Sequence, residues 1–425
     1  MHYFRISVVV VLLANILFVS ITAKSYEGYK LYQLTPKGEE DINILQNLSK
    51  QVERFDFLNS ETVIVEPNSL KEFENALEKY QLEYKLLDED VGKTLTRNFE
   101  VNRLMKTLKP YKGQERLSTE RYYSHGEINA YLEYLAQTYP QRVILKTMGY
   151  SFEGRALKAI TITNGQGSYD KNVILVDGGF HAREWISPAS AIYAIEQLVE
   201  NFEANKELLA DYNWVILPVV NADGYEYTQV SADTRMWRKT RKPLFHEGGI
   251  CYGTDPNRNF DFHWNEEGAS SDPCSNTFAG PKAFSEPEAM VVRDLIHTNS
   301  VKGQMYLTLH SQGKLLLYPW GWTDALPDTW EDLHEVAAAG ADAIYQATGT
   351  NYTVGSSTTV LYVAAGASDD YAFNAGFPIA FTMELPGAGS TGFDPPVEMI
   401  DELVKETWVG IKAMGLKVIE KYPVV

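Results

Sequence analysis

Hydrophobic residues beyond about residue 122 follow two alternating patterns. Short apolar runs, typical of buried strands, are separated by longer segments in which apolar residues repeat with the 3.6-residue period of an amphipathic helix. The predicted strands cover residues 142–151, 157–164, 172–180, 213–220, 305–312 and 377–385. The predicted helices cover residues 127–140, 187–202, 285–299, 329–349 and 398–415. This alternation predicts an α/β domain over residues 122–425, with a mixed, mostly parallel sheet flanked by helices.

The segment over residues 24–112 has a different pattern. Its strand-like runs at residues 29–34, 62–66 and 83–87 are separated by helical periodicity at residues 39–53 and 69–80. Elements of this size predict a small α+β domain with an antiparallel sheet.

The polar, basic stretch over residues 97–123 contains Pro and Gly, and we interpret it as an exposed linker that reaches about residue 121. In such a linker, Lys109, Lys112, Arg116 and Arg121 would be open to a trypsin-like protease.

Residues 1–23 have the layout of a secretory signal peptide. A basic residue stands early, an apolar run extends from Ile6 to Val19, and small residues lead up to Ala23. A membrane anchor is the alternative, but the apolar run is short for a span. We therefore predict a secreted, extracellular protein with no later membrane segment.

Composition and charge narrow the class of partner. The chain is 44% hydrophobic and 12% aromatic, which is ample for a large packed core. Its 38 basic and 56 acidic residues give a formal charge of -18, which argues against nucleic acid and against an anionic membrane surface as partners. No pattern indicates a coiled coil or an obligate partner, so we expect a monomer.

The chain has two cysteines, Cys251 and Cys274, which flank one loop-like segment. In an oxidising compartment, a lone close pair is expected to form a disulfide. Thiolate metal ligands are the alternative, but further cysteines, which such a site needs, are missing nearby.

Side chains that could bind a metal or transfer a proton stand where predicted strands end. His181 and Glu184 follow the strand at 172–180, and His310 and Glu384 stand near the ends of two others. The carboxyl ends of parallel strands meet at one edge of a sheet, so these side chains should lie together. Two imidazoles and one carboxylate are a known ligand set for a catalytic Zn²⁺ with one open position, and we expect one ion per chain. Glu384 would be the carboxylate that does not bind the metal and acts as a general base.

Five short motifs resemble those of the zinc metallocarboxypeptidases of the digestive pancreatic type. They are HAREW at residues 181–185, WRKTR at 237–241, NRNF at 257–260, HS at 310–311 and FTMEL at 381–385. The resemblance runs over nearly the whole chain: residues 24–112 resemble the activation propeptide and residues 122–425 the catalytic domain. It implies a zymogen that a trypsin-like protease activates, and an enzyme that hydrolyses the C-terminal bond of peptide and protein substrates, in a gut lumen. Protein inhibitors are further expected partners.

The resemblance also implies a role for each matching residue. His181, Glu184 and His310 would bind zinc, and Glu384 would be general base and later proton donor. Arg238 would polarise the scissile carbonyl. The expected substrate contacts are Arg183, Asn257, Arg258, Ser311 and Tyr362, of which Asn257 and Arg258 would hold the terminal carboxylate. Taken singly, Arg238 could lie on a solvated basic face, Asn257 and Arg258 could belong to an ordinary loop, and Tyr362 could belong to the core.

Specificity is expected to depend on Asp369, which matches the base of the pocket for the terminal side chain in family members that remove Lys and Arg. A buried carboxylate without a partner is costly, so such a pocket selects a cation. Three alternatives stay open: Asp370 takes this place, Asp369 caps a helix, or the enzyme prefers aromatic and aliphatic termini like carboxypeptidase A.

Two further features bear on activity. Gln312 stands where the family commonly has a tyrosine, which puts the subsites and inhibitor contacts beyond the scissile bond in doubt.

A catalytically dead protein that binds peptide C-termini is the alternative from another class, but such proteins usually lose a metal ligand or the general base, and here none of these residues is missing. A serine hydrolase would need a nucleophile motif that the sequence lacks.

Overall fold

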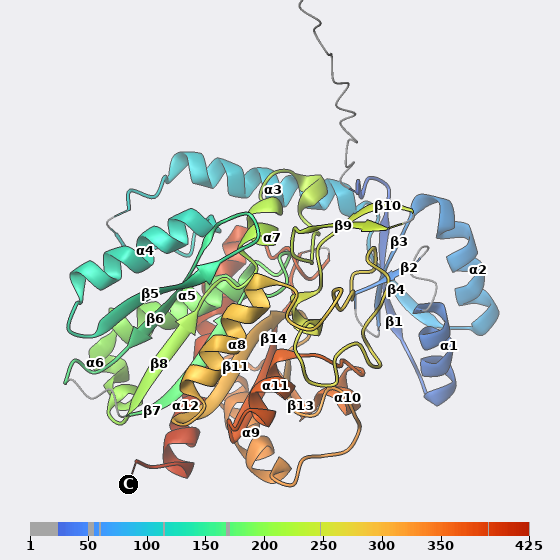
Figure 1. The fold of residues 1–425 in the computed structure, drawn as a ribbon. Helices are drawn as coiled ribbons and strands as arrows, with labels where there is room; N and C mark the ends of the chain where they lie inside the picture. Colours follow the sequence, from blue (N-terminus) through green and yellow to red (C-terminus); the bar gives the residue numbers. More distant parts are fainter. Residues whose placement is uncertain are drawn as a thin grey trace, which may run out of the picture.

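The computed structural model describes residues 24–49, 55–58, 61–113, 115–166, 171–246, 248–389 and 391–424. The predicted signal peptide, residues 1–23, lies outside them. A small N-terminal domain lies against one side of a larger α/β domain, as Figure 1 shows. None of the helices that the structure describes has the length and apolar character needed to cross a bilayer.

The N-terminal domain is built on a four-stranded antiparallel sheet, which confirms the predicted α+β class. The strand order is β2-β3-β1-β4. The strands are β1 (Lys30–Thr35), β2 (Phe55–Phe57), β3 (Thr62–Val65) and β4 (Glu83–Asp88), and the helices are α1 (Glu39–Ser49) and α2 (Leu70–Tyr80). Phe55, Val63 and Phe73 lie in the core of this domain. The pattern did not predict β2, because three residues are too few to show an alternation.

Helix α3 (Val91–Leu108) contradicts the prediction of an exposed linker over residues 97–123. Asp90 caps its N-terminus by accepting a hydrogen bond from a backbone amide of the first turn. Val91 and Leu95 are buried in contact with the larger domain, which stabilises a helix whose own apolar periodicity is weak. The exposed connection is therefore shorter than predicted.

Part of the remaining connection is also buried. Lys109, Lys112 and Arg116 are exposed, as predicted, but Arg121 is only 2% exposed. Its guanidinium donates to both carboxylate oxygens of Glu127, at 2.7 and 3.2 Å. The prediction that Arg121 is open to a protease is therefore wrong, because its side chain is held in a largely buried ion pair.

The larger domain has an eight-stranded mixed sheet in the order β13-β12-β14-β11-β7-β8-β6-β5. The strands are β5 (Val143–Tyr150), β6 (Ala156–Ile162), β7 (Asn172–Gly178), β8 (Tyr212–Leu217), β11 (Gly303–Ser311), β12 (Leu315–Tyr318), β13 (Thr353–Ser356) and β14 (Ile379–Leu385). The central strands β14, β11, β7 and β8 are parallel, and β5 and β6 form an antiparallel edge. This confirms the predicted mixed, mostly parallel sheet.

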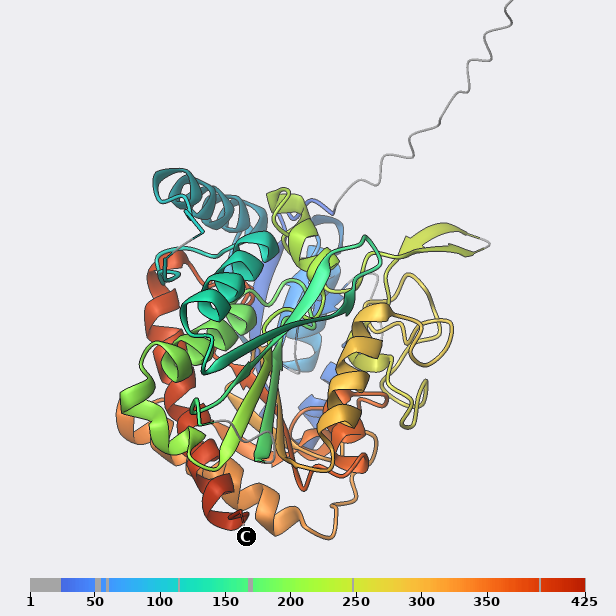
Figure 2. The ribbon, with the colours of Figure 1, turned by 60° about the vertical axis from the view of Figure 1, so that its left-hand side comes forward.

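Helices cover both faces of this sheet, as the turned view in Figure 2 shows. The helices of one layer are α4 (His125–Thr138), α5 (Ile186–Val199), α9 (Trp330–Thr348) and α12 (Ile400–Lys421), and those of the other are α8 (Pro287–Asn299) and α11 (Ser368–Asn374). The shorter helices are α6 (Phe202–Asn205), α7 (Ala222–Tyr227) and α10 (Ser357–Val360). The core lies between these layers and the sheet, where side chains such as Trp214, Tyr306 and Phe377 are fully buried.

A two-stranded hairpin projects from the larger domain, formed by β9 (Pro243–His246) and β10 (Gly249–Tyr252). Cys251 of this hairpin forms a disulfide with Cys274, and their Cα atoms are 5.2 Å apart. The predicted pairing is therefore present in the structure, and it joins the hairpin to the loop that precedes α8.

The two domains meet in a mixed apolar cluster. Tyr26, Leu31, Ile64, Val91 and Leu95 of the N-terminal domain and α3 join Met236 and Phe393 of the larger domain. Leu58 packs against this cluster and also lines the main cleft of the larger domain. The N-terminal domain therefore lies over part of that cleft.

Candidate active site

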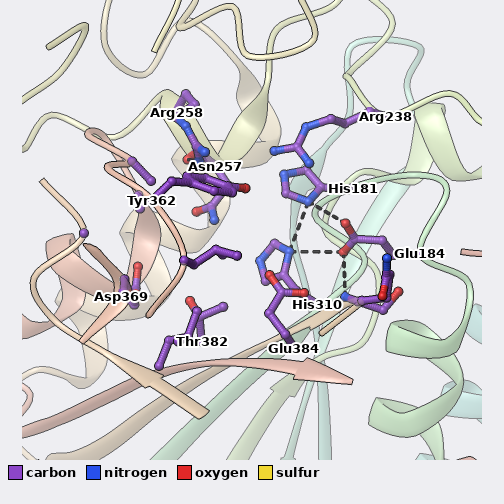
Figure 3. A pocket seen from close by; sticks show the side chains of 18 of the residues that line it. His181, Glu184, Arg238, Asn257, Arg258, His310, Tyr362, Asp369, Thr382 and Glu384 are labelled. Carbon is purple, nitrogen blue, oxygen red and sulfur yellow. Dashed lines mark hydrogen bonds and ion pairs between the residues drawn. The ribbon is translucent and has the colours of Figure 1, made fainter. Parts of the chain in front are cut away.

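Strand ends bring the predicted metal ligands together. Gly179, with φ of +69°, turns the chain as it leaves β7, and His181 and Glu184 follow in the turn before α5. His310 lies near the end of β11, and its register partner on the neighbouring parallel strand β14 is Glu384. The sheet therefore places four groups from three segments at one edge, as Figure 3 shows.

Three of these groups form a buried donor cluster. Nδ1 of His181 lies 2.8 Å from Glu184 Oε1, and Nδ1 of His310 lies 3.1 Å from Glu184 Oε2. The two imidazole Nδ1 atoms are 3.1 Å apart. All three side chains are at least 95% buried, and their donor atoms lie within 4.8 Å of one another. Two imidazoles and a carboxylate that converge in this way fit the donor set that zinc prefers.

A second layer of contacts orients the cluster. Asp255 Oδ1 lies 3.1 Å from His181 Nε2, and its Oδ2 accepts two hydrogen bonds from Arg238, at 2.7 and 3.1 Å. The backbone amide of Ser311 donates to Glu184 Oε2 at 3.2 Å. A carboxylate on the far nitrogen of a ligating histidine fixes the orientation of the ring. Asp255 is not among the residues predicted from the sequence, although it stands just before the NRNF motif.

Burial and neighbouring charges shift the pKa values of the two carboxyl groups at this site in opposite directions. Burial raises the pKa of the Glu184 carboxyl, but His181 and His310 outweigh this effect and hold the pKa well below its usual range. Burial raises the pKa of Glu384 to about 8, against the opposing effect of His310. Among the described residues, neither Glu384 Oε2 nor His310 Nε2 has a hydrogen-bond partner. Glu384 therefore lines the cleft with an uncommitted oxygen.

On the other side of the cleft lie the predicted carboxylate-binding residues. The short 3₁₀ turn Pro256–Arg258 carries Asn257 and Arg258, and Asp255 caps it. Arg258 donates through Nε to Gly268 O at 3.0 Å, and its guanidinium carbon lies 6.0 Å from the ring centre of Tyr362. Tyr362 is 45% exposed and is therefore not a core residue.

Arg183 and Ser311 also line the cleft, as does Phe393 of the segment that follows β14. Arg183 is 6% exposed, and its guanidinium carbon lies 4.1 Å from the Phe393 ring centre. The hydroxyl of Ser311 is buried and has no partner among the described residues. Gln312, where the sequence departs from the expected tyrosine, lines the same cleft.

The two adjacent aspartates of α11 have different surroundings. Asp370 is fully buried and accepts hydrogen bonds from the backbone amides of Gly321 and Trp322, at 2.9 to 3.1 Å. Asp369 lines the cleft with Thr382, and burial raises the pKa of its carboxyl. The N-cap of α11 is Ala367, so Asp369 is not the N-cap residue. Of the two aspartates, only Asp369 lines the cleft.

We expect the Asp255→Asn substitution to weaken zinc binding by about 10- to 100-fold, because the neutral amide cannot hold both His181 and Arg238 as the carboxylate does. Competition with a chelator of known affinity measures the change. Asp261→Asn, at an exposed position on the same loop, is the matched control and should bind zinc as the natural chain does. Equal zinc affinity in the two variants would contradict this role of Asp255.

Comparison with known proteins agrees with this geometry. The profile of the family described as zinc carboxypeptidase matches residues 128–410, and that of the carboxypeptidase activation peptide matches residues 32–98. Carboxypeptidase B of Astacus astacus is 43% identical over 302 residues, which cover 71% of this chain and 98% of that protein. Carboxypeptidase B of Helicoverpa zea is 39% identical over 407 residues, which cover 91% and 93%.

A solved structure extends the agreement to the arrangement of both domains. The crystal structure of the carboxypeptidase A from Helicoverpa armigera superposes with a TM-score of 0.86 at 32% identity, and the match covers 93% of this chain and 99% of that one. The fold, the donor cluster and the matched profiles lead to one conclusion: this chain belongs to the zinc carboxypeptidase family and carries the family's activation peptide.

Proposed function

We propose that the protein is the secreted zymogen of a digestive, monomeric carboxypeptidase that removes Lys and Arg from peptide C-termini. We infer the preference for Lys and Arg from Asp369, a buried carboxylate that lines the cleft. Its neighbour Asp370 instead accepts hydrogen bonds from backbone amides. A cationic side chain would neutralise Asp369, whereas an apolar side chain would leave its charge unpaired.

His181, Glu184 and His310 would hold one Zn²⁺. When bound, the ion supplies Lewis-acid chemistry and a more acidic water at the reacting carbonyl. Its positive charge also favours the ionised form of Glu384, whose pKa burial raises to about 8. Glu384 would thus be a base near neutral pH in the metal-loaded protein.

Glu384 then takes a proton from the attacking water and delivers it to the leaving nitrogen as the peptide bond breaks. Arg238 is held by Asp255 at the cleft wall and places a fixed positive charge where the carbonyl oxygen becomes negative. The charge is positioned before the reaction, so no reorganisation is needed when the oxyanion forms.

Asn257, Arg258 and Tyr362 account for exopeptidase action. Arg258 presents a guanidinium to the cleft, where a terminal carboxylate would form a charge-assisted contact. A peptide bond in the middle of a chain has no such carboxylate to offer. Arg183 lines the cleft beside Phe393, and we assign it contacts with substrate residues further from the terminus; Ser311 lines the same cleft as a further substrate contact.

The proposal is tested with the trypsin-treated protein and matched peptides that end in Lys, Arg, Leu or Phe, each also prepared as the C-terminal amide. We expect release of Lys and Arg from the free acids, no release from the amides, and loss of activity with a zinc chelator that added Zn²⁺ reverses. Preferred release of Leu or Phe would keep the chemistry and refute the assignment of Asp369. An absence of release from all peptides, with the activation peptide removed, would favour a binding protein.

A further inference from the structure

The connection between the domains contains several basic residues, but their surroundings differ sharply. A trypsin-like protease must draw the residues on both sides of the cleaved bond into its own cleft, so it selects exposed segments with few contacts. The surroundings of each Lys and Arg on this connection therefore indicate which bond can be cut. This question rests on the proposed function, because it presupposes activation of a zymogen.

Most of these basic residues are unsuitable. Lys106 lies within α3 and its ammonium group donates to Gln229. Lys109 is followed by Pro110, and the imide bond before a proline is a poor substrate for trypsin-like proteases. Arg121 is 2% exposed and bound to Glu127. Helical backbone thus excludes Lys106, the following proline excludes Lys109, and burial excludes Arg121 as the cleavage position.

Arg116 is half-exposed, but the bond that follows it is anchored on the catalytic domain. Its guanidinium pairs with Glu196, whose side chain is 4% exposed. Leu117 is 4% exposed and lines a small cavity between α5 and α12. Thr119 Oγ1 donates to Asp401 Oδ1 at 2.9 Å. A protease could reach this bond only after Leu117 has left its apolar contacts.

Lys112 and Gly113 themselves have none of these restraints, and the nearest anchored residue on the N-terminal side is Tyr111, whose ring packs against the core of the larger domain and contacts Tyr123. Lys112 is exposed, and its side chain has no hydrogen bond or ion pair with any residue that the structure describes. Gly113 has φ of +82°, and apart from Gly113 and its two chain neighbours no described residue has an atom within 4 Å of the place where a Cβ would stand. A glycine can reach the extended backbone that a protease requires without steric cost.

From this contrast we infer that the Lys112–Gly113 peptide bond is the activation bond. Water is added across its C–N bond by a trypsin-like protease, which leaves a carboxylate on Lys112 and an α-ammonium group on Gly113. The mature chain begins at Gly113 and keeps Arg116 on Glu196 and Leu117 in its cavity. The new N-terminal segment thus stays docked on α5 and α12 after the activation peptide has left.

The test uses the full-length zymogen and a low ratio of trypsin, with N-terminal sequencing and intact mass of the larger fragment. The expected first product begins at Gly113. Lys112→Gln should slow conversion by about tenfold or more, and the matched variant Arg116→Gln should leave its rate unchanged. A first product that begins at Leu117, or equal conversion of Lys112→Gln and the natural chain, would overturn the inference.

The same experiment is repeated with the Glu384→Gln variant, which is expected to lack activity. It separates this inference from the proposed function, because it measures the N-terminal sequence of the product and does not require catalysis by the protein. Thermal unfolding of each variant verifies that it is folded. The N-terminal sequence of the product obtained from the natural chain identifies the cleaved bond without any variant. Cleavage at Gly113 without release of Lys or Arg would refute the proposed function alone. Release of Lys and Arg by a chain that begins elsewhere would refute the cleavage site alone.

Discussion

Replacing Glu384 by Gln is expected to lower kcat by about 10²- to 10⁴-fold, which is the contribution typical of a general base. The amide has nearly the shape of the carboxylate but cannot take up the proton of the attacking water. KM should change little, because in the proposed function Arg258 and Asp369 hold the substrate and Glu384, on β14, does not. Steady-state kinetics on a peptide ending in Lys measures both constants.

The control for this substitution is Glu331→Gln, at an exposed position in the first turn of α9. It removes the same charge from the same domain and should keep full activity. Zinc content must stay equal in the three proteins, since Glu384 is not proposed as a ligand. Retention of more than about a tenth of the natural kcat in Glu384→Gln would contradict its role as the base.

Replacing Asp369 by Asn is expected to reverse the specificity of the pocket. Removing one partner of a buried charge pair costs about 2–5 kcal/mol, so kcat/KM for peptides ending in Lys or Arg should fall by about 30- to 5,000-fold. The values for Leu and Phe should rise, because no carboxylate is then left unpaired. Competition between two peptides in one tube measures the ratio directly.

Asp370→Asn is the matched control, one residue away and equally buried. Its carboxylate accepts backbone hydrogen bonds from Gly321 and Trp322, so the substitution should lower the free energy of unfolding by about 1–3 kcal/mol and leave the Lys-to-Leu ratio unchanged. If Asp370→Asn changes the ratio and Asp369→Asn does not, the two aspartates have been assigned the wrong way round.

The positions of His181, His310 and Glu384 could be predicted because each lies near the end of a strongly patterned strand or just after it. A buried strand is recognisable from composition, and parallel strands must end at the same edge. The structure adds the register that pairs His310 of β11 with Glu384 of β14. The hydrophobic periodicity of the sequence does not predict this register. The choice between Asp369 and Asp370 likewise required the contacts of Gly321 and Trp322.

Other features depend on contacts between distant segments. Asp255 reaches His181 across 74 positions of sequence, from a loop whose own residues show no periodicity. Helix α3 exists because Val91 and Leu95 pack on the other domain, whereas local pattern reading expects only a polar stretch. The four-residue strands β12 and β13 are too short to stand out from loop sequence.

Leu58 lines the catalytic cleft, so the N-terminal domain is a ligand of the enzyme to which it is attached. A short connection holds such a ligand at an effective concentration of about 1 mM, at which an interface with a Kd of about 1 μM stays closed about 99.9% of the time. Once the connection is cut, the same interface is half open when the free N-terminal fragment is at about 1 μM. In the proposed zymogen, hydrolysis of one bond would therefore make activity depend on dilution, and the volume into which the protein is secreted would become part of its control.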